Sequence, residues 1–281
     1  MRYVILGSGG MLGRDLVRQL EGREVVALTR REVDVTDATA VRAAVAVAHA
    51  VINAAAYTRV DDAETHEVEA LAVNGVAAGI AAAAAAEAGA RFVQLSTDYV
   101  FDGRATEPYP EDAPRHPLGA YGRAKAEGEL RVLAAHPDAY VVRTAWLYGR
   151  HGSNFARTML SLAAQRDTVS VVTDQVGQPT WTRDLAGWIV GLLDAEAPAG
   201  IYHGTNSGTA SWFDFAREIF VTAGLDPERV RPTVAADFVR PAPRPAYSVL
   251  GHGAWASAGL PAPRPWGDAL AAAARDGALA A

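Results

Sequence analysis

The sequence has 281 residues and no cysteine. The chain therefore has no disulfide framework, no thiolate nucleophile and no metal site built on sulfur. Its seven histidines are scattered and form no H-x-x-x-H pair, so a histidine metal site is not expected. Basic residues are fewer than acidic ones, 26 against 32, which gives a net charge of −6. That charge argues against a general surface for nucleic acid or for an anionic membrane.

Long hydrophobic runs are also missing. The N-terminus "MRYVILGSGG" has one early arginine and only four apolar residues before a glycine cluster, too short for a signal peptide. The longest weakly apolar run, 75–90, is mostly alanine and glycine and contains Glu87. It falls short of the roughly 20 strongly apolar residues of a membrane span. We expect a packed helix of small residues there, and a cytoplasmic protein.

Short apolar runs alternate with helical spacing over the first 150 residues. Strands are predicted at 2–7, 24–29, 50–56, 91–96 and 139–149, and helices at 11–21, 37–48, 63–88 and around Tyr121. Continuous apolar strands that alternate with helices are typical of a parallel sheet covered on both faces. The sequence therefore predicts an α/β fold with a doubly wound parallel sheet of the Rossmann type, formed by residues 1–150.

The pattern loosens after residue 150. A helix at 153–166 and a strand at 169–175 keep the alternation, so we also assign about 169–200 to the first domain. Beyond it come "GIYHGT", an aromatic helix at 211–224 and the proline-rich segment 240–250. The remainder of 151–281 is thus expected to form mainly a smaller C-terminal lobe. It would lie over the carboxyl ends of the strands, where ligands bind in such sheets.

A glycine-rich turn, "GSGGMLG", joins the first strand to the first helix. It fits G-x-x-G-x-x-G through Gly7, Gly10 and Gly13. Glycines there let backbone N–H groups approach a pyrophosphate at a helix N-terminus. We expect a dinucleotide on the glycines and on Met11 and Leu12.

The end of the second strand bears on the choice of cofactor. A site specific for NAD usually has an acid there, which holds the ribose 2′-hydroxyl. This strand ends in Thr29, Arg30 and Arg31. A guanidinium pair favours a 2′-phosphate, so NADPH is the expected cofactor. NADH stays the alternative, with both arginines merely solvated in a surface turn.

The segment "STDYVF" follows the fourth strand and places Thr97 at the carboxyl edge of the sheet. About 24 residues later, Tyr121 and Lys125 lie one turn apart on a helix, where they share a face. A free tyrosine has a pKa near 10, and a nearby ammonium is expected to lower it into a useful range for acid catalysis. The three residues match the arrangement of the short-chain dehydrogenases/reductases.

Six stretches narrow this resemblance. The sequence resembles the dTDP-4-dehydrorhamnose reductase family, whose members have the extended short-chain reductase fold, from residue 1 to about 250. The stretches are "DVTD" (34–37), "VINAAAYTRVDDAE" (51–64), "LSTDYVFDG" (95–103), "YGRAKAEGE" (121–129), "RTAWLYG" (143–149) and "DQVGQPTWTRDLA" (174–186). The resemblance implies reduction of the 4-keto group of dTDP-4-dehydrorhamnose, or of a close dTDP-4-keto-6-deoxy sugar, to the 4-hydroxyl.

The resemblance also implies roles for residues. Thr97 would bond the keto oxygen, Tyr121 would donate the proton, and Lys125 would orient Tyr121 and bind the nicotinamide ribose. Ala54, Ala55 and Tyr57 would lie along the cofactor, and Asp34 and Val35 beside the adenine. The expected substrate contacts are Asp98, Tyr99 and Trp146 at the sugar, and Asn154 and Arg244 at the diphosphate. Two of these have a plain alternative: Trp146 as a core residue and Arg244 as a solvated one.

Departures from related enzymes leave other readings open. Some family members dimerise through a magnesium ion held by glutamates, but residues 266–281 contain no glutamate. A metal-linked dimer is therefore not expected, and a monomer and a homodimer both stay open. Nucleotide-sugar 4,6-dehydratases and 4-epimerases share the fold and recycle NAD. The dehydratases use an Asp-Glu pair where this chain has Asp98 and Tyr99. A non-catalytic NADP-binding regulatory subunit is the third reading.

Overall fold

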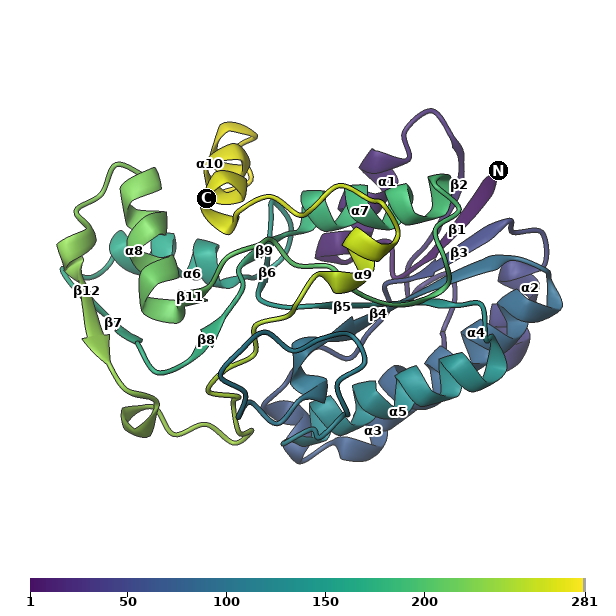
Figure 1. Cartoon of the computed structure of the whole chain (residues 1–281), viewed down its shortest axis with the longest axis horizontal. Coiled ribbons are helices and arrows are strands. Elements are labelled where there is room, and N and C mark those ends of the chain that lie inside the picture. The colour runs from purple at the N-terminus through teal and green to yellow at the C-terminus, as the bar shows by residue number, and fades with distance from the viewer. Residues whose placement is uncertain (280–281) are drawn as a thin grey trace.

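A computed structural model describes residues 1–279 of the chain (Figure 1). Its centre is a six-stranded sheet in the order β2-β1-β3-β4-β5-β10, in which all neighbouring strands are parallel. The strands are β1 (Arg2–Leu6), β2 (Glu24–Leu28), β3 (Ala50–Asn53), β4 (Arg91–Thr97), β5 (Tyr140–Thr144) and β10 (Gly200–His203). The order of the strands reverses between β1 and β3: from β1 the chain adds β2 on one side, and then adds β3, β4 and β5 on the other. Open α/β sheets bind ligands at such a point. The doubly wound fold is confirmed.

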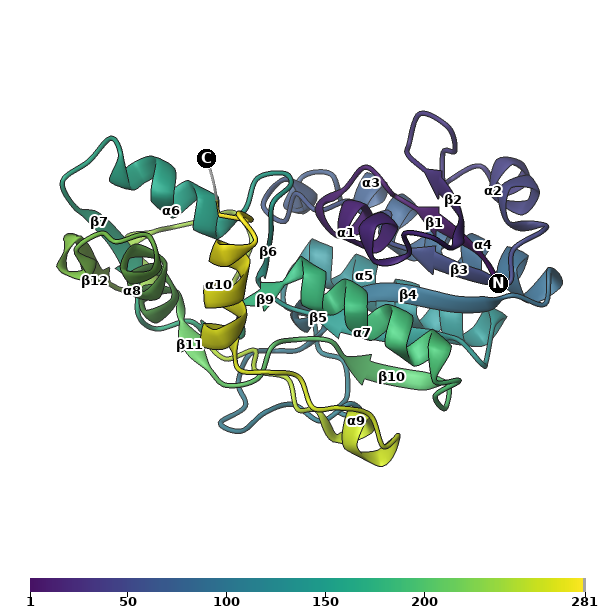
Figure 2. The same ribbon diagram turned by 90° about the horizontal axis from the view of Figure 1, so that it is seen from above.

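Helices cover both faces of this sheet (Figures 1 and 2). On one face, α1 (Met11–Gln19) and α7 (Thr182–Asp194) pack against each other and bury leucine and isoleucine side chains on the sheet. On the other face lie α2 (Ala38–Val45), α4 (Ala77–Glu87) and α5 (Ala120–Ala135). Strands β1, β3, β4 and β5 are therefore buried on two sides, which explains their largely apolar sequences, whereas the edge strand β2 is mostly exposed.

The helical run 67–87 consists of α3 (Glu67–Leu71), a π-helical turn (Ala72–Val76) and α4. Its length and apolar composition would suffice to cross a membrane, but half of its most apolar window is buried inside the molecule. Its alanines pack on β3, β4 and α5. The run is thus the core helix of small residues that the sequence predicts.

A smaller lobe lies beside the sheet, at the left of Figure 1. Its core joins α6 (Phe155–Ala163), α8 (Trp212–Thr222) and α10 (Trp266–Arg275). Three two-stranded sheets complete the chain; α9 (Gly253–Ser257) packs on β10. The small sheets are β6 (Leu147–Tyr148) with β9 (Thr180–Trp181), β7 (Val169–Val172) with β12 (Val230–Thr233), and β8 (Val176–Gly177) with β11 (Ala210–Ser211).

Three predicted elements differ from the structure. The predicted strand 139–149 breaks after β5, because Trp146 adopts a positive φ of 46° and the chain turns into β6. The predicted strand 169–175 does not extend the main sheet, since β7 pairs with β12 in the lobe. Conversely, "GIYHGT", which we predicted to lie in the lobe, contributes β10, the edge strand of the main sheet.

Candidate functional site

The glycine-rich turn has the tight geometry that the motif predicts. Gly7 has a φ of 81°, and a Cβ atom there would lie 2.5 Å from the backbone nitrogen of Ala55. A Cβ on Gly13 would lie 2.3 Å from the carbonyl oxygen of Gly7. Both positions therefore require glycine. The turn leads into α1, whose Met11, Leu12 and Gly13 carry first-turn N–H groups without intrahelical partners, a site suited to an anion.

The carboxyl end of β2 lies beside this turn, because the backbone N–H groups of Gly7 and Ser8 both donate to the Leu28 carbonyl. Arg30 and Arg31 are exposed there. The sequence analysis overlooked Glu32, whose carboxylate accepts hydrogen bonds from the backbone and hydroxyl of Thr29. Thr29 holds the pKa of Glu32 below its ordinary value. The end of β2 thus carries the two exposed guanidinium groups of Arg30 and Arg31, and the Glu32 carboxylate, which is already bonded to Thr29.

The segment after β2 carries Asp34 and Val35. Asp34 is exposed and accepts hydrogen bonds from the backbone and hydroxyl of Thr36, which lower its pKa. Val35 is half-buried and packs against the core of the α2 face. The two residues form a turn of defined shape at the β2 edge of the sheet.

Small residues follow β3 on the other side of the turn. Ala54 donates its backbone N–H to the Leu6 carbonyl, and Ala55 donates to the Asn53 side chain. Asn74, in the π-helical turn, accepts from the backbone N–H of Tyr57 and donates to its carbonyl, both at 2.9 Å. The π turn therefore fixes the path of the chain past β3, a frequent use of π-helical insertions at functional sites.

Thr97, Tyr121 and Lys125 converge at the carboxyl end of β4. Thr97 ends this strand and is 6% exposed. Tyr121 lies in the first turn of α5, and its hydroxyl is close enough to Thr97 for that side chain to lower the Tyr121 pKa. Lys125, 4% exposed, donates from Nζ to the Leu95 carbonyl of β4 at 2.7 Å. The predicted trio is thus brought together from one strand and one helix.

The expected lowering of the tyrosine pKa is not found in this structure. Burial raises the pKa of Tyr121, and the nearby carboxyl of Asp98 raises it further. Burial also lowers the pKa of Lys125 to about 8, against the opposing effect of the Glu129 carboxylate. The physical reason is that desolvation disfavours the charged form of both groups. The prediction that the pKa of Tyr121 is lowered was therefore wrong.

A residue that the sequence analysis did not single out fixes the start of α5. The N-cap is Gly119, which has no side chain to bond the first turn. Glu64 supplies the cap instead, since its Oε1 accepts the backbone N–H of Ala120 at 2.8 Å. A carboxylate at a helix N-terminus is favourable for the orphan N–H groups and for the helix dipole. Glu64 therefore positions the turn that carries Tyr121.

A buried ion network lies under the same helix. Glu129, one turn beyond Lys125, is fully buried and binds Arg143 of β5 through two bonds, of 2.9 and 2.8 Å. Ser96 and Arg115 donate to the same carboxylate. Burial raises the pKa of Glu129, but these donors outweigh it and hold the pKa below its usual value. The network ties α5 to β4 and β5 directly beneath the trio.

Asp98 and Tyr99, two of the residues expected at the sugar, directly follow Thr97. Burial raises the pKa of Asp98 to about 6, against the lowering effects of Ser248 and Thr97. The Tyr99 ring packs edge-on against Tyr121 at 5.8 Å between centroids. Arg244 stacks over Tyr99 at 5.8 Å and bonds Asp61 at 2.9 Å. Arg244 is therefore not merely solvated, and the sequence analysis overlooked its partner Asp61.

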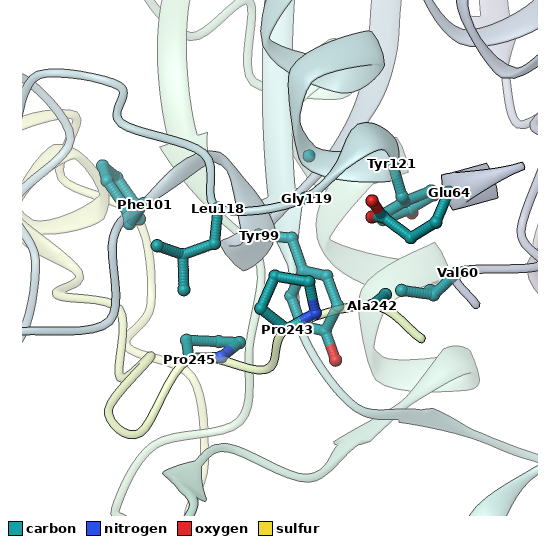
Figure 3. Close-up of a pocket in the computed structure, with 11 residues that line it drawn as sticks. Val60, Glu64, Tyr99, Phe101, Leu118, Gly119, Tyr121, Ala242, Pro243 and Pro245 are labelled. Atoms are coloured by element: carbon teal, nitrogen blue, oxygen red, sulfur yellow. The ribbon is translucent and has the colours of Figure 1, made fainter. Parts of the chain in front are cut away.

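A small cavity lies beside Tyr99 and Tyr121 (Figure 3). Tyr121 and Tyr99 form part of its wall, and Pro243 and Pro245 of the proline-rich loop close it. Its volume is about 10 Å³, which is room for about one water molecule. A hexose placed in this cavity would therefore require the loop to move outward. Asp61 holds the loop through Arg244 and the backbone N–H of Ala242.

Two other predicted substrate contacts have structural partners. Trp146 stacks on Trp212 of α8, with 3.6 Å between ring centroids and 8° between planes. It is half-buried and joins the aromatic core of the lobe through this contact. Asn154 is the N-cap of α6: it accepts from the Arg157 N–H and donates to the Gly149 carbonyl. Both ends of its amide are thus already bonded within the protein.

Within residues 1–279, no group of three His, Cys, Asp or Glu side chains could hold a metal ion. The chemical resources of the site are therefore a backbone anion cradle, two exposed arginines beside it, and a hydroxyl–phenol–ammonium trio. Such a set can bind a dinucleotide and deliver a proton to an oxygen at the sheet edge.

Comparisons with known proteins agree with this arrangement. A model of the family described as "RmlD substrate binding domain" matches residues 1–278. The chain is 51% identical to the probable dTDP-4,6-dihydroxy-2-methyloxan-3-one 4-ketoreductase of Streptomyces antibioticus, covering 96% of this chain and 93% of the relative. It is 49% identical to the dTDP-4-dehydrorhamnose reductase of Streptomyces griseus, covering 96% and 91%. The crystal structure of the Bacillus anthracis dTDP-4-dehydrorhamnose reductase in complex with NADP is 35% identical, with a TM-score of 0.95 over 98% of this chain and 99% of that one. The chain therefore belongs to the RmlD substrate binding domain family, the family of the dTDP-4-dehydrorhamnose reductases.

Proposed function

We propose that this protein reduces the 4-keto group of a dTDP-4-keto-6-deoxy sugar with NADPH, and that dTDP-4-dehydrorhamnose is the first substrate to test. The observation that carries the proposal is the convergence of Thr97, Tyr121 and Lys125 at the end of β4. The family membership and the reductase names of the relatives support it.

The cofactor is assigned from the cradle around α1. The close approach of Gly7 and Gly13 to neighbouring backbone leaves no space for side chains, so N–H groups face an incoming pyrophosphate. Arg30 and Arg31 at the end of β2 are suited to a 2′-phosphate, which favours NADPH over NADH. Bound there, NADPH supplies the hydride for C4 of the sugar. The B. anthracis relative, solved with NADP, supports the same choice.

The protein's own groups manage the proton. Thr97 would turn its single O–H from Asp98 to the keto oxygen, and this hydrogen bond would polarise the carbonyl. Tyr121 then transfers its proton to the developing alkoxide, and its raised pKa means that it is protonated beforehand at neutral pH. Lys125 holds the nicotinamide ribose and stabilises the phenolate that remains after the transfer.

The sugar would occupy the side closed by Tyr99 and Arg244, in the lobe formed mainly by residues 151–281, while the sheet holds the cofactor. Asp98 and Trp146 would contact the hexose. Arg244 would leave Asp61 to meet the diphosphate, with Asn154 nearby as a backbone-fixing cap. A dehydratase needs a second carboxylate directly after Asp98, where this chain has Tyr99, and that difference argues against the alternative.

The test is a panel of dTDP-4-keto-6-deoxy sugars assayed for NADPH oxidation, with the stereochemistry at C4 of each product read by NMR. Wild-type protein should oxidise NADPH with at least one sugar, and the Tyr121→Phe variant should be roughly 10²–10⁴-fold slower because it lacks the general acid. A parallel reaction with dTDP-glucose and NAD should give no 4-keto product. Formation of that product, or full activity of Tyr121→Phe, would refute the assignment.

We expect the protein to be cytoplasmic, to be a monomer or a homodimer, and to need no Mg²⁺. Gel filtration with and without a chelator would check the last two together, because a metal-linked dimer would dissociate.

A further inference from the structure

Within residues 1–279, three buried side-chain oxygens lack a hydrogen-bond partner: Asp98 Oδ2, Thr144 Oγ1 and the Tyr148 hydroxyl. Asp98 directly follows β4, and Thr144 ends the neighbouring strand β5. Buried polar atoms are nearly always paired, so unpaired ones that gather at one strand edge indicate a ligand that completes them. Asp98 already has an expected role at the sugar, whereas Thr144 has none.

Thr144 lies beside the trio. The register of the sheet pairs it with Thr97, and parallel partners project to the same face. Thr144 is 7% exposed, and Thr97 is 6% exposed. The Thr97 hydroxyl is engaged, since it donates to Asp98 and accepts from the Tyr99 N–H. The Thr144 hydroxyl, 47 residues further along the chain, has the same setting and no partner.

The packing of β5 shows on which face of the sheet Thr144 lies. Val142, two residues earlier on β5 and therefore on the same side, packs in the core shared with α1 and α7. The glycine-rich turn and α1 are on this face, whereas Tyr121 reaches the edge from α5 on the opposite face. A group that meets Thr144 thus approaches from the face that carries the glycine-rich turn, which is also the face of Thr97.

The order of the strands indicates which part of the cofactor arrives there. The adenosine end belongs at β2 and the pyrophosphate at the turn after β1, which touches Ala55 after β3. A dinucleotide that continues past β3, β4 and β5 would reach Lys125 at β4 and would end at β5. The last polar group of NADPH beyond the ribose is the carboxamide of its nicotinamide ring.

We propose that the Thr144 hydroxyl binds the nicotinamide carboxamide and thereby fixes the rotation of the ring over Thr97 and Tyr121. This inference rests on the proposed function, because it assumes a nicotinamide cofactor on α1. A hydroxyl both donates and accepts, so it can pair with either end of a carboxamide. Thr144 is a positioning residue in this role: it orients the ring and takes no part in the proton transfer.

The test compares Thr144→Val, which keeps the shape and deletes the hydroxyl, with Thr144→Ser, which restores it. Thr158→Val is the matched control, because the Thr158 hydroxyl is bonded within α6 to the Asn154 carbonyl. Melting temperatures are measured without ligand and with NADPH or NADH, and the dissociation constants by fluorescence. Steady-state rates follow with the sugar that the panel identifies.

Without ligand, Thr144→Val should melt at or above the wild-type temperature, because an unpaired buried hydroxyl has been removed. Its affinity for NADPH should fall about 3- to 10-fold, the effect of one neutral hydrogen bond. The turnover number should fall as well, while KM for the sugar stays unchanged. Thr144→Ser should recover most of both losses, and Thr158→Val should bind NADPH like the wild type.

Wild-type affinity of Thr144→Val for NADPH would overturn the proposal. So would a loss seen only in KM for the sugar, which would place the hydroxyl at the ketone. The binding measurement needs no sugar, so a failure of the substrate assignment leaves this test intact. A wild-type protein that binds neither NADPH nor NADH would overturn the cofactor assignment and this inference together.

Discussion

The buried carboxylate of Glu129 offers the sharpest test of how the site is held together. Glu129→Gln keeps the volume, removes the negative charge and replaces one acceptor oxygen by an NH2 donor. Arg143, 1% exposed, would then keep a guanidinium without its counter-charge, while Arg115, 22% exposed at its side chain, can turn to water. Removing one partner of a buried ion pair costs about 3–5 kcal/mol. Typical total stabilities are about 5–15 kcal/mol, so we expect a large loss.

That loss can be read as a melting temperature. Each kcal/mol shifts the midpoint by about 2–4 °C in domains of this size. Glu129→Gln should therefore melt about 6–20 °C below the wild type, measured by circular dichroism without ligand. The matched control is Glu87→Gln, whose partner is Arg42. Both of those side chains are more than half exposed, at 53% and 60%, and such pairs contribute about 0–1 kcal/mol.

The pH dependence adds an independent check on the same carboxylate. The folded-state pKa of Glu129 is lowered from the ordinary value of 4.5. Its contribution to stability is therefore complete above pH 4.5 and is lost as the pH falls below that value towards the folded-state pKa. The glutamine variant lacks this proton uptake, so its acid unfolding should be less steep. Equal melting temperatures for the wild type and Glu129→Gln would refute the reasoning.

Three further predictions concern other ionisable groups. Replacing Arg30 and Arg31 together by Ala should weaken NADPH more than NADH by about 1–3 kcal/mol in fluorescence titrations, because charged hydrogen bonds to a 2′-phosphate are lost; equal losses would contradict a phosphate contact. Burial lowers the pKa of Lys125 to about 8, so kcat/KM should decline as the pH rises through about 8, and this limb should vanish from any residual activity of Lys125→Met. Burial, and next Arg143, lower the pKa of His203 from 6.5 to about 3. The contribution of His203 to the free energy of unfolding should thus be complete above pH 6.5 and be lost as the pH falls from 6.5 to about 3. The urea midpoint of His203→Gln should fall less over this range than that of the wild type. An equal fall of the two midpoints would exclude His203 as the cause.

The sequence predicted the elements whose burial is two-sided. Strands β1, β3 and β4 are buried along almost their whole length, so their apolar runs are continuous and easily found. β7 alternates between buried and exposed residues, because it belongs to a two-stranded sheet with one solvated face. β10 has only four residues and includes His203, which is buried by its bonds to Arg143 and the Gly251 carbonyl. The local sequences of β7 and β10 therefore do not show to which sheet each strand belongs.

The site divides in the same way. Thr97, Tyr121 and Lys125 follow from local rules, since a strand end and an i, i+4 pair on a helix are written in adjacent residues. The groups that hold them are not local. Arg143 of β5 binds Glu129 of α5. Glu64 caps α5 although it lies 56 residues before Ala120, and Asp61 binds Arg244 across 183 residues. Such partners are fixed by tertiary packing, so residue types alone did not select them.

The pKa values of Tyr121 and Lys125 show what the packing adds to chemistry that the sequence predicts. A reduction consumes a proton at the alkoxide, so the acid has to be protonated before the hydride arrives. Burial and the Asp98 carboxyl raise the pKa of Tyr121 and keep this proton in place. In the proposed reaction, Lys125, held on the Leu95 carbonyl, would have its electrostatic effect after the transfer, when a phenolate would have formed one helical turn away. Burial of the ammonium is favourable at that stage, because a charge pair interacts more strongly in a medium of low dielectric. Desolvation thus raises the pKa of Tyr121 before the transfer. In the proposed reaction, the same desolvation would strengthen the attraction between the Lys125 ammonium and the Tyr121 phenolate.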